Sequence, residues 1–226
     1  MKRIRILKIP VFLACLTPLA LLAWKGYASL LGANPIEVIT RSTGKWTLTF
    51  LLVTLAITPV RRLTGLHWLI RFRRMTGLFA FFYGCLHFLT YIWLDKFFDL
   101  HDVVKDVAKR PFITVGFTAF VLMIPLAVTS TQGWIRRLGG RRWNLLHRLI
   151  YISAIAGVVH FWWLVKADVR RPAIYASALA ALLGYRLLFY AARSLMRSPA
   201  PRSKQPAAAD SRAGDVLLGG GYSEVK

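Results

Sequence analysis

The stretch that decides the fold runs from Trp143 to Trp163 and reads WNLLHRLIYISAIAGVVHFWW. It is long and apolar enough to cross a bilayer, yet it contains two histidines, His147 and His160. A third histidine, His87, lies in another apolar run. Polar side chains inside a membrane are costly and mark functional sites by default. Because imidazole is a standard axial ligand of heme iron, histidines on two neighbouring spans predict a porphyrin held between them.

The composition is that of a compact membrane protein. The chain has 226 residues, of which 56% are hydrophobic, and it includes eight Trp. The formal charge of +22 would suggest nucleic-acid binding in a soluble protein. Here Lys and Arg lie in the gaps between apolar runs, so we expect no nucleic-acid binding and interpret the charges as determinants of membrane topology.

Six apolar runs approach the length of a membrane span. They predict an all-α fold, a six-helix transmembrane bundle within residues 1–195, with membrane lipid around it. The runs cover about residues 9–31, 46–60, 75–94, 112–129, 144–165 and 173–192. The two cysteines lie in different runs, far apart in sequence, and we expect no disulfide.

Basic residues set the expected orientation of these spans. They gather before the first run, in residues 61–74 and in residues 130–143, whereas residues 95–110 balance basic with acidic side chains. The positive-inside bias puts the three basic segments in the cytoplasm, and with them both termini. Residues 196–226 are rich in Pro, Ala, Ser and Gly and predict a disordered cytoplasmic tail.

Two of the histidines are expected at matching depth. In this orientation the third and fifth spans both run outward, and His87 lies ~12 Å and His160 ~9 Å from the outer charges that follow them. We therefore predict that they form the axial pair of one heme in the outer leaflet. Glycines in the spans leave room for close helix packing or for a flat ligand, at Gly77, Gly84, Gly116, Gly157 and Gly184.

His147 has a different expected position. It lies near the cytoplasmic interface, ~20 Å along the helix from His160, and on an ideal helix the two side chains point ~140° apart. Three roles are open for it: ligand of a second heme, alternative ligand of the first, or hydrogen-bond partner of a cofactor. Aromatic residues near the histidines would suit a porphyrin wall, namely Phe79, Phe81, Phe82, Phe88, Phe161, Trp162 and Trp163. His67 and His101 are expected in solvated loops.

Three segments in this order resemble a known family. They are FRRMTGLFAFFYGCLH at residues 72–87, KRPFITVGFTAFVLMIPLAVTS at residues 109–130, and WNLLHRLIYISAIAGVVHFWW at residues 143–163. They are similar to MsrQ, also called YedZ, the heme-binding membrane subunit of a bacterial methionine-sulfoxide reductase system. That family belongs to the ferric-reductase-like transmembrane superfamily. The resemblance covers residues 1 to about 195.

The resemblance implies a function in electron transfer. Electrons from the respiratory quinone pool, or from a cytosolic flavin reductase, would pass through heme b to a periplasmic molybdopterin subunit in a heterodimer. That partner would repair methionine sulfoxide in periplasmic proteins. The same resemblance implies that the protein lies in the bacterial inner membrane, that His87, His147 and His160 are the heme-associated histidines, and that FMN is a further cofactor.

One position departs from the wider superfamily. Oxidase-type relatives carry a second histidine fourteen positions before the outer ligand of the third span, and this chain has Arg73 there. A guanidinium does not ligate iron, although it can pair with a heme propionate or a flavin phosphate. An inner heme with two histidine ligands is therefore not expected.

The residues offer no catalytic constellation of their own. We find no nucleophile with a base, no carboxylate pair within the spans and no Gly-rich phosphate loop. The leading hypothesis is therefore a non-catalytic electron-transfer subunit of an oxidoreductase. The alternatives are a stand-alone transmembrane ferric reductase and a transporter or scaffold that binds no heme.

Overall fold

The structure, a computed structural model, describes residues 2–165 and 167–196. The chain divides into two units, Met1–Phe189 and Tyr190–Lys226. Of the second unit, only the end of the last helix and Met196 are described. The tail predicted at residues 196–226 therefore lies, apart from Met196, outside the described residues.

All regular structure in the described part of the chain is helical, which confirms the predicted all-α class. The helices follow each other with short connections. In chain order they are α1 (Lys2–Tyr27), α2 (Pro35–Thr64), the 3₁₀ helix η1 (His67–Phe72), α3 (Arg73–Thr90), the π-helical turn η2 (Tyr91–Asp95), α4 (Leu100–Lys109), α5 (Pro111–Val128), α6 (Gln132–Leu146), α7 (Leu149–Leu164) and α8 (Arg170–Leu195).

Five of these segments are individually long and apolar enough to span a membrane. They are α1 from Ile6, α2, the continuous segment from His67 to Asp95, α5 and α8. A sixth span results if α6 and α7, which meet at a 40° bend, are taken together. The structure thus supports five or six spans at nearly the predicted places.

The second span is much longer than the predicted run of residues 46–60. α2 begins at Pro35, after the side chain of Asn34 accepts a hydrogen bond from the Glu37 amide. It ends at Gly65, whose φ of +72° terminates the helix in the left-handed region. The prediction was too short because the first turns of α2 are polar, with an ion pair between Glu37 and Arg41, and a search for apolar runs omits them.

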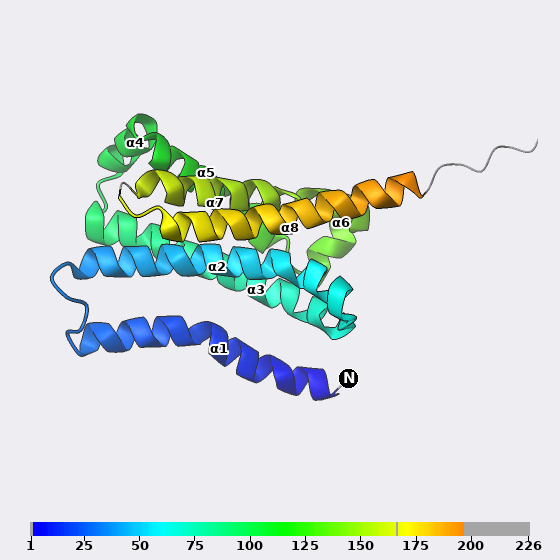
Figure 1. The fold of residues 1–226 in the computed structure, drawn as a ribbon. Coiled ribbons are helices and arrows are strands. Elements are labelled where there is room, and N and C mark those ends of the chain that lie inside the picture. The colour runs from blue at the N-terminus through cyan, green and yellow to red at the C-terminus, as the bar shows by residue number, and fades with distance from the viewer. Residues whose placement is uncertain (1, 166, 197–226) are drawn as a thin grey trace, which may run out of the picture. The chain divides into compact units, whose positions relative to one another are not determined.

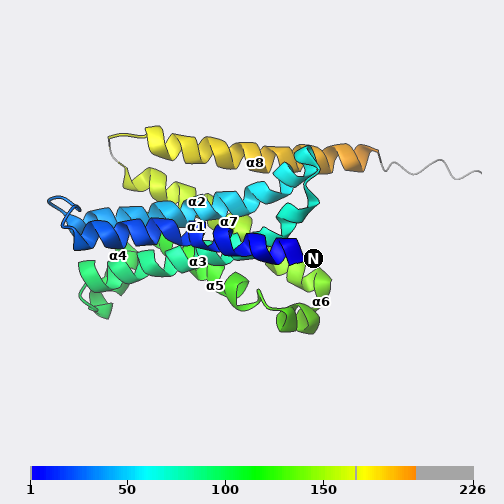
Figure 2. The same cartoon turned by 90° about the horizontal axis from the view of Figure 1, so that it is seen from below.

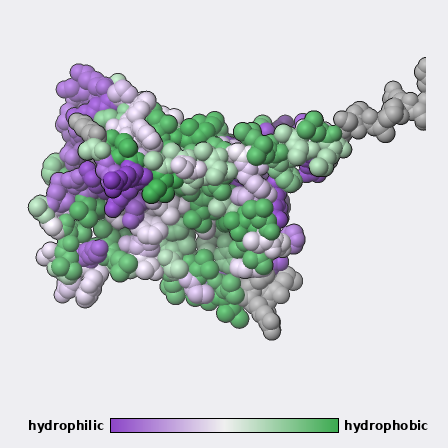
Figure 3. Space-filling view, in the orientation of Figure 1, coloured by the Kyte–Doolittle hydropathy of each residue, from purple (hydrophilic) through white to green (hydrophobic). Residues whose placement is uncertain are grey.

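Two segments predicted as loops are helices. α4 lies within the acidic and basic segment 95–110, and α6 covers most of the basic segment 130–143, continues to Leu146 and has a kink at Gly139, where φ is +73°. They lie at opposite ends of the bundle in both ribbon views (Figures 1 and 2). Hydrophilic residues gather near α4 on the face in Figure 3, and apolar residues cover much of the middle of that face. This distribution fits a protein whose middle lies in lipid.

The core is built from two helix pairs. α2 packs along α3 and α5 along α7 more extensively than any other pair of described elements. Buried residues from both pairs form one hydrophobic cluster, which includes Leu55, Ala80, Met123 and Ala154. Contacts between the pairs include the stacked rings of Phe81 and Phe120 and the contact of Gly157 with Leu48.

Tyr83 attaches α1 to this core. Its side chain is 1% exposed, and its hydroxyl donates to the Cys15 carbonyl at 2.9 Å and accepts from the Leu19 amide at 3.2 Å. In a regular helix that amide would bond to that carbonyl directly, so the tyrosine hydroxyl is inserted into the helical hydrogen-bond ladder. Pro18 lies beside the insertion, and α1 bends visibly along its length (Figure 1).

Replacing this hydroxyl tests the attachment of α1. We expect Tyr83→Phe to lower the free energy of unfolding by about 1 kcal/mol, because a buried carbonyl and amide lose their bridge. Thermal unfolding in detergent measures the effect. Tyr175→Phe, which removes a hydroxyl bonded only to Thr49, should have a smaller effect, and equal effects would contradict the assigned role of Tyr83.

A polar network holds the connection between α3 and α5. Lys96 Nζ lies 2.7 Å from Asp106, Arg110 Nε lies 3.3 Å from the same carboxylate, and the Tyr91 hydroxyl donates to it at 3.3 Å. The hydrogen bond from Lys96 holds the pKa of Asp106 below its usual range, and the carboxylate in turn raises the pKa of Lys96. The ion pair therefore remains charged over a wide range of pH.

The signs of these pKa shifts predict how the connection responds to pH. Asp106 stabilises the folded state above its unfolded pKa and loses this effect as pH falls through its lowered folded pKa. Lys96 stabilises the folded state at a pH below its unfolded pKa, and this stabilisation is lost only as the pH rises through its raised folded pKa. Hydrogen–deuterium exchange of residues 96–110 should therefore change little between about pH 5 and 9, after correction for intrinsic rates, and protection should fall below about pH 4. Asp106→Asn should remove the acid transition; a wild-type transition near neutral pH would contradict the network.

Candidate functional site

The structure brings the rings of His87 and His160 together. Their centroids are 6.2 Å apart and their planes are inclined by 69°. His87 is on α3 and His160 on α7, so the two rings meet where one helix pair faces the other. Both side chains are only partly buried, although each lies within an apolar helix. Residues separated by 73 positions in the chain thus form one site.

The His87 ring is held by α2. Its Nδ1 lies 2.9 Å from the Thr40 carbonyl oxygen, and the Thr43 hydroxyl is 3.5 Å from the same nitrogen. Gly44 lies against the ring, since a Cβ at this position would be 3.0 Å from His87 Cε1. The absence of a side chain at Gly44 therefore makes room for the imidazole.

The His160 ring is held by α5 in the same way. Its Nδ1 lies 2.6 Å from the Phe112 carbonyl oxygen, and a Cβ on Gly116 would be 2.6 Å from that nitrogen. Gly116 follows Phe112 by four residues, as Gly44 follows Thr40. Each helix pair thus holds one histidine by a carbonyl and by a glycine one turn later.

These hydrogen bonds determine the tautomer of both histidines. A carbonyl oxygen only accepts, so each Nδ1 carries the proton and each Nε2 has a free lone pair. Neither Nε2 has a hydrogen-bond partner in the part of the chain that is described. A backbone carbonyl bonded to the distal nitrogen is the usual arrangement that orients a metal-binding histidine.

The separation of the rings fits one metal ion between them. With a metal–nitrogen bond of about 2 Å and a ring centre roughly 1 Å behind the nitrogen, imidazoles on opposite sides of an ion have centres about 6 Å apart. The observed 6.2 Å matches this value. Within residues 2–165 and 167–196, no group of three or more His, Cys, Asp and Glu gathers to hold a bare ion. The residues therefore fit heme iron, whose porphyrin supplies the remaining ligands.

His147 is separate from this pair. It lies at the bend between α6 and α7, where its ring stacks on Trp143 at 3.8 Å and its Nδ1 donates to the Trp143 carbonyl at 3.0 Å. Its Nε2 is buried and has no hydrogen-bond partner among the described residues. Arg73, the position at which the oxidase-type relatives have histidine, is close enough to act on this imidazole electrostatically. His67 and His101 are both exposed, as expected, but neither lies in a loop: His67 begins η1 and His101 lies in α4.

The predicted aromatic wall does not form as one surface. Phe88 stacks on Phe120 at 4.9 Å, Phe161 contacts Tyr175, and Trp162 and Trp163 are exposed. Aromatic side chains on one helix point in several directions, so closeness in sequence does not make them neighbours.

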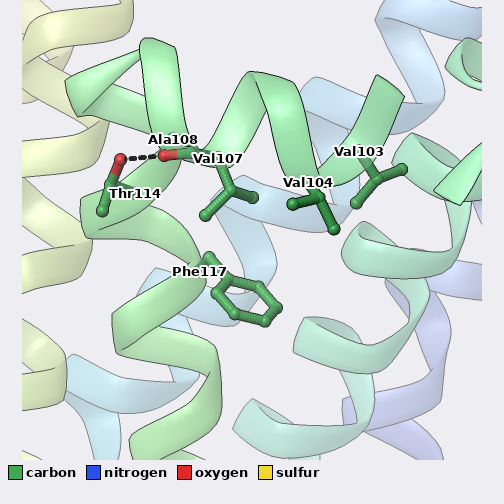
Figure 4. A pocket seen from close by; sticks show the side chains of 6 residues that line it. All are labelled: Val103, Val104, Val107, Ala108, Thr114 and Phe117. Atoms are coloured by element: carbon green, nitrogen blue, oxygen red, sulfur yellow. Dashed lines mark hydrogen bonds between the residues drawn. The ribbon is translucent and has the colours of Figure 1, made fainter. Parts of the chain in front are cut away.

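A hollow of about 370 Å³ between α4 and α5 is also separate from the histidines (Figure 4). Its lining is apolar except for Thr114, whose hydroxyl donates to the Val107 carbonyl. The other lining residues are Val103, Val104, Val107, Ala108 and Phe117. No side chain in this lining ligates a metal.

Sequence reasoning missed the residues that orient the histidines. Thr40 and Phe112 act through their backbone carbonyls, which no residue type reveals. Gly44 lies in the polar first half of α2, outside the predicted span, and Gly116 was expected only to provide room. The repeated spacing, a glycine one turn after the carbonyl, is a signal that becomes readable only once the two helix pairs are known.

Comparisons with known proteins identify a matching family model and several similar proteins. Residues 43–158 match the family model described as ferric reductase like transmembrane component. The chain is similar to a protein named protein-methionine-sulfoxide reductase heme-binding subunit MsrQ from Herminiimonas arsenicoxydans, at 56% identity over 83% of this chain and 87% of that relative. Proteins of the same name from Ralstonia nicotianae and Azospira oryzae are 55% and 51% identical, over 82% and 92% of this chain and 87% and 88% of the relatives.

Substitution of Gly116 tests whether the missing side chain at this position makes room for the His160 ring. We expect Gly116→Ala to lose most of the heme bound per protein, because its Cβ would displace the imidazole. Absorption of the purified protein in the Soret region measures this. Gly184→Ala is the matched control, since a Cβ there meets nothing within 4 Å. Alanine favours helix at both positions, so equal heme content in the two variants would show that Gly116 is not needed to make room for the His160 ring.

Proposed function

This chain belongs to the family of MsrQ heme-binding subunits within the ferric-reductase-like membrane proteins, and on that premise we propose that it carries electrons through a heme b ligated by His87 and His160. It is a multi-pass protein of the bacterial inner membrane, and the electrons cross that membrane. The observation that supports this most directly is the 6.2 Å separation of two rings whose Nε2 atoms are free to bind iron. When bound, heme supplies reversible one-electron chemistry.

The protein residues provide ligation, orientation and shielding. Thr40 and Phe112 hold the imidazoles by their carbonyls, which raises the basicity of each Nε2 as a ligand. Phe88, the residue after His87, stacks on Phe120 of α5 at 4.9 Å and adds apolar packing between the two helix pairs. Stronger donation by the ligands stabilises the oxidised state of iron more than the reduced state, so these two hydrogen bonds tune the reduction potential.

His147 supports a second cofactor on the other side of the membrane. Its Nε2 has a free lone pair in a buried position, as expected of a histidine that ligates or hydrogen-bonds a cofactor. Since Arg73 stands where a second histidine ligand would be required, we propose that this cofactor is either a heme with His147 as its only histidine ligand or FMN.

The proposed partners follow from the family. We place both termini in the cytoplasm, where the quinone pool or a flavin reductase supplies electrons at the His147 side. The His87–His160 side then faces the periplasm, where a molybdopterin subunit in a heterodimer accepts them and reduces methionine sulfoxide. The chain's own basic segments support this orientation, since residues 61–74 and 130–143 share one side of the predicted topology.

Single substitutions of the three histidines test the ligand assignment. We expect His87→Ala and His160→Ala each to lose the heme with two histidine ligands, because an iron with one remaining imidazole binds far more weakly. His147→Ala should retain that heme. Reduced-minus-oxidised spectra, scaled to protein concentration, measure the outcome.

The controls are His67→Ala and His101→Ala, which change exposed histidines and should leave the spectrum unchanged. Full heme content in His87→Ala or His160→Ala would exclude the proposed pair. Reduction of the bound heme by a quinol, compared with NADH plus a flavin reductase, then distinguishes the two donors.

A further inference from the structure

Four buried polar atoms toward the α6 end of the bundle have no hydrogen-bond partner among the described residues. They are Thr58 Oγ1, Arg61 Nε, His147 Nε2 and Arg186 Nε, and we name these four residues the polar cluster. We propose that the polar cluster binds an oxyanion, a carboxylate or a phosphate of a ligand embedded in the membrane, with Arg186 as its anchor. This inference rests on the proposed function to the extent that His147 faces the same ligand.

Arg186 is a buried cation without a counter-ion in the described part of the chain. It is 7% exposed and lies in the apolar helix α8, nine residues before its end. None of the ion pairs found within residues 2–165 and 167–196 includes it. A buried guanidinium is stable only where an anion or several acceptors compensate its charge, and in a membrane protein such a residue marks a ligand site by default.

Two neighbouring helices fix the position of this guanidinium. Pro59 has no amide hydrogen, so the Leu55 carbonyl one turn earlier in α2 lacks its helical donor. Arg186 Nη2 donates to that carbonyl at 2.8 Å, and Nη1 donates to the Tyr151 hydroxyl of α7. The Tyr151 ring also lies 5.0 Å from the guanidinium carbon. Two of the three nitrogens are thus used by the protein, and the Nε side of the guanidinium remains for a ligand.

The other three residues of the polar cluster lie close in sequence to Leu55 and Tyr151, the two residues that bind Arg186. On α2, Thr58 lies one turn after Leu55, and Arg61 lies one turn after Thr58. On the other side, His147 precedes Tyr151 by four residues. Thr58 and Arg61 thus lie on the two turns of α2 that follow Leu55, and His147 lies at the end of α6, just before α7 begins.

The donors in the polar cluster define the chemistry of the ligand. The guanidinium groups of Arg61 and Arg186 only donate hydrogen bonds, and the Thr58 hydroxyl also can donate one. Carboxylates and phosphates match the guanidinium in charge and in the spacing of their oxygens, so an oxyanion satisfies the donors that a neutral ligand leaves unpaired.

The test uses pairs of probes that differ only in the oxyanion. Heme-loaded full-length protein in phosphatidylcholine nanodiscs is titrated with hemin and hemin dimethyl ester, which lacks free carboxylates, and with FMN and riboflavin, which lacks the phosphate. Phospholipid that remains after delipidation is measured as phosphorus. Arg186→Gln should weaken binding of one oxyanion probe by roughly tenfold or more and leave its neutral counterpart unchanged.

Two further variants separate binding from folding. Pro59→Ala combined with Arg186→Gln restores an amide donor for the Leu55 carbonyl, so this double variant should fold and still bind the oxyanion weakly. Arg62→Gln is the charge-matched control, because Arg62 adjoins Arg61 but lies over the Phe189 ring at 3.7 Å. His87→Ala should lose the heme of the His87–His160 pair and keep the Arg186-dependent difference between probes, which separates this proposal from the heme assignment.

The outcomes identify the source of the oxyanion. A selective loss with hemin assigns a carboxylate, a selective loss with FMN assigns a cofactor phosphate, and a loss of retained phosphorus alone assigns a lipid headgroup; each supports the proposal. Equal changes within each probe pair, no change in any of the three measurements, or wild-type binding by the double variant would overturn it.

Discussion

The histidine site depends on the hydrogen bond that a backbone carbonyl of a neighbouring helix accepts from each of two histidines. The carbonyls of Thr40 and Phe112 bind Nδ1 of His87 and His160, so both rings are held in one tautomer with Nε2 available. Because the two ring centroids then lie 6.2 Å apart, the site requires the correct packing of all four helices that carry these residues. The packing of α2 on α3 and of α5 on α7 therefore brings these two rings together.

The two helix pairs use the same arrangement. In α2 and in α5 a glycine follows the accepting carbonyl by one turn, and in α3 and α7 the histidine extends into the space that this glycine leaves. Each helix pair contributes one of the two histidines, so the rings meet between the pairs and not within one of them. The polar cluster has a different basis, since there a proline in α2 frees a carbonyl and the buried Arg186 of α8 binds it.

The sequence was sufficient to predict the helical class, the approximate spans and the proximity of His87 and His160, because apolar length and polar residues inside spans are both readable from residue types. It was insufficient for α4 and α6, whose charged residues resemble those of loops, and for the polar beginning of α2. It also could not reveal the roles of Thr40, Gly44 and Phe112. These depend on which helices are neighbours, and hydrophobic pattern alone does not specify that.

The most direct test of the central claim is the electron paramagnetic resonance spectrum of the oxidised, heme-loaded protein. Two imidazole ligands make ferric heme low-spin, and ring planes inclined by 69° predict the highly anisotropic type of low-spin signal. We expect this signal to dominate in the wild type and to disappear in His87→Ala and in His160→Ala. A high-spin signal from the wild-type protein, which indicates an iron without its second histidine, would contradict the account.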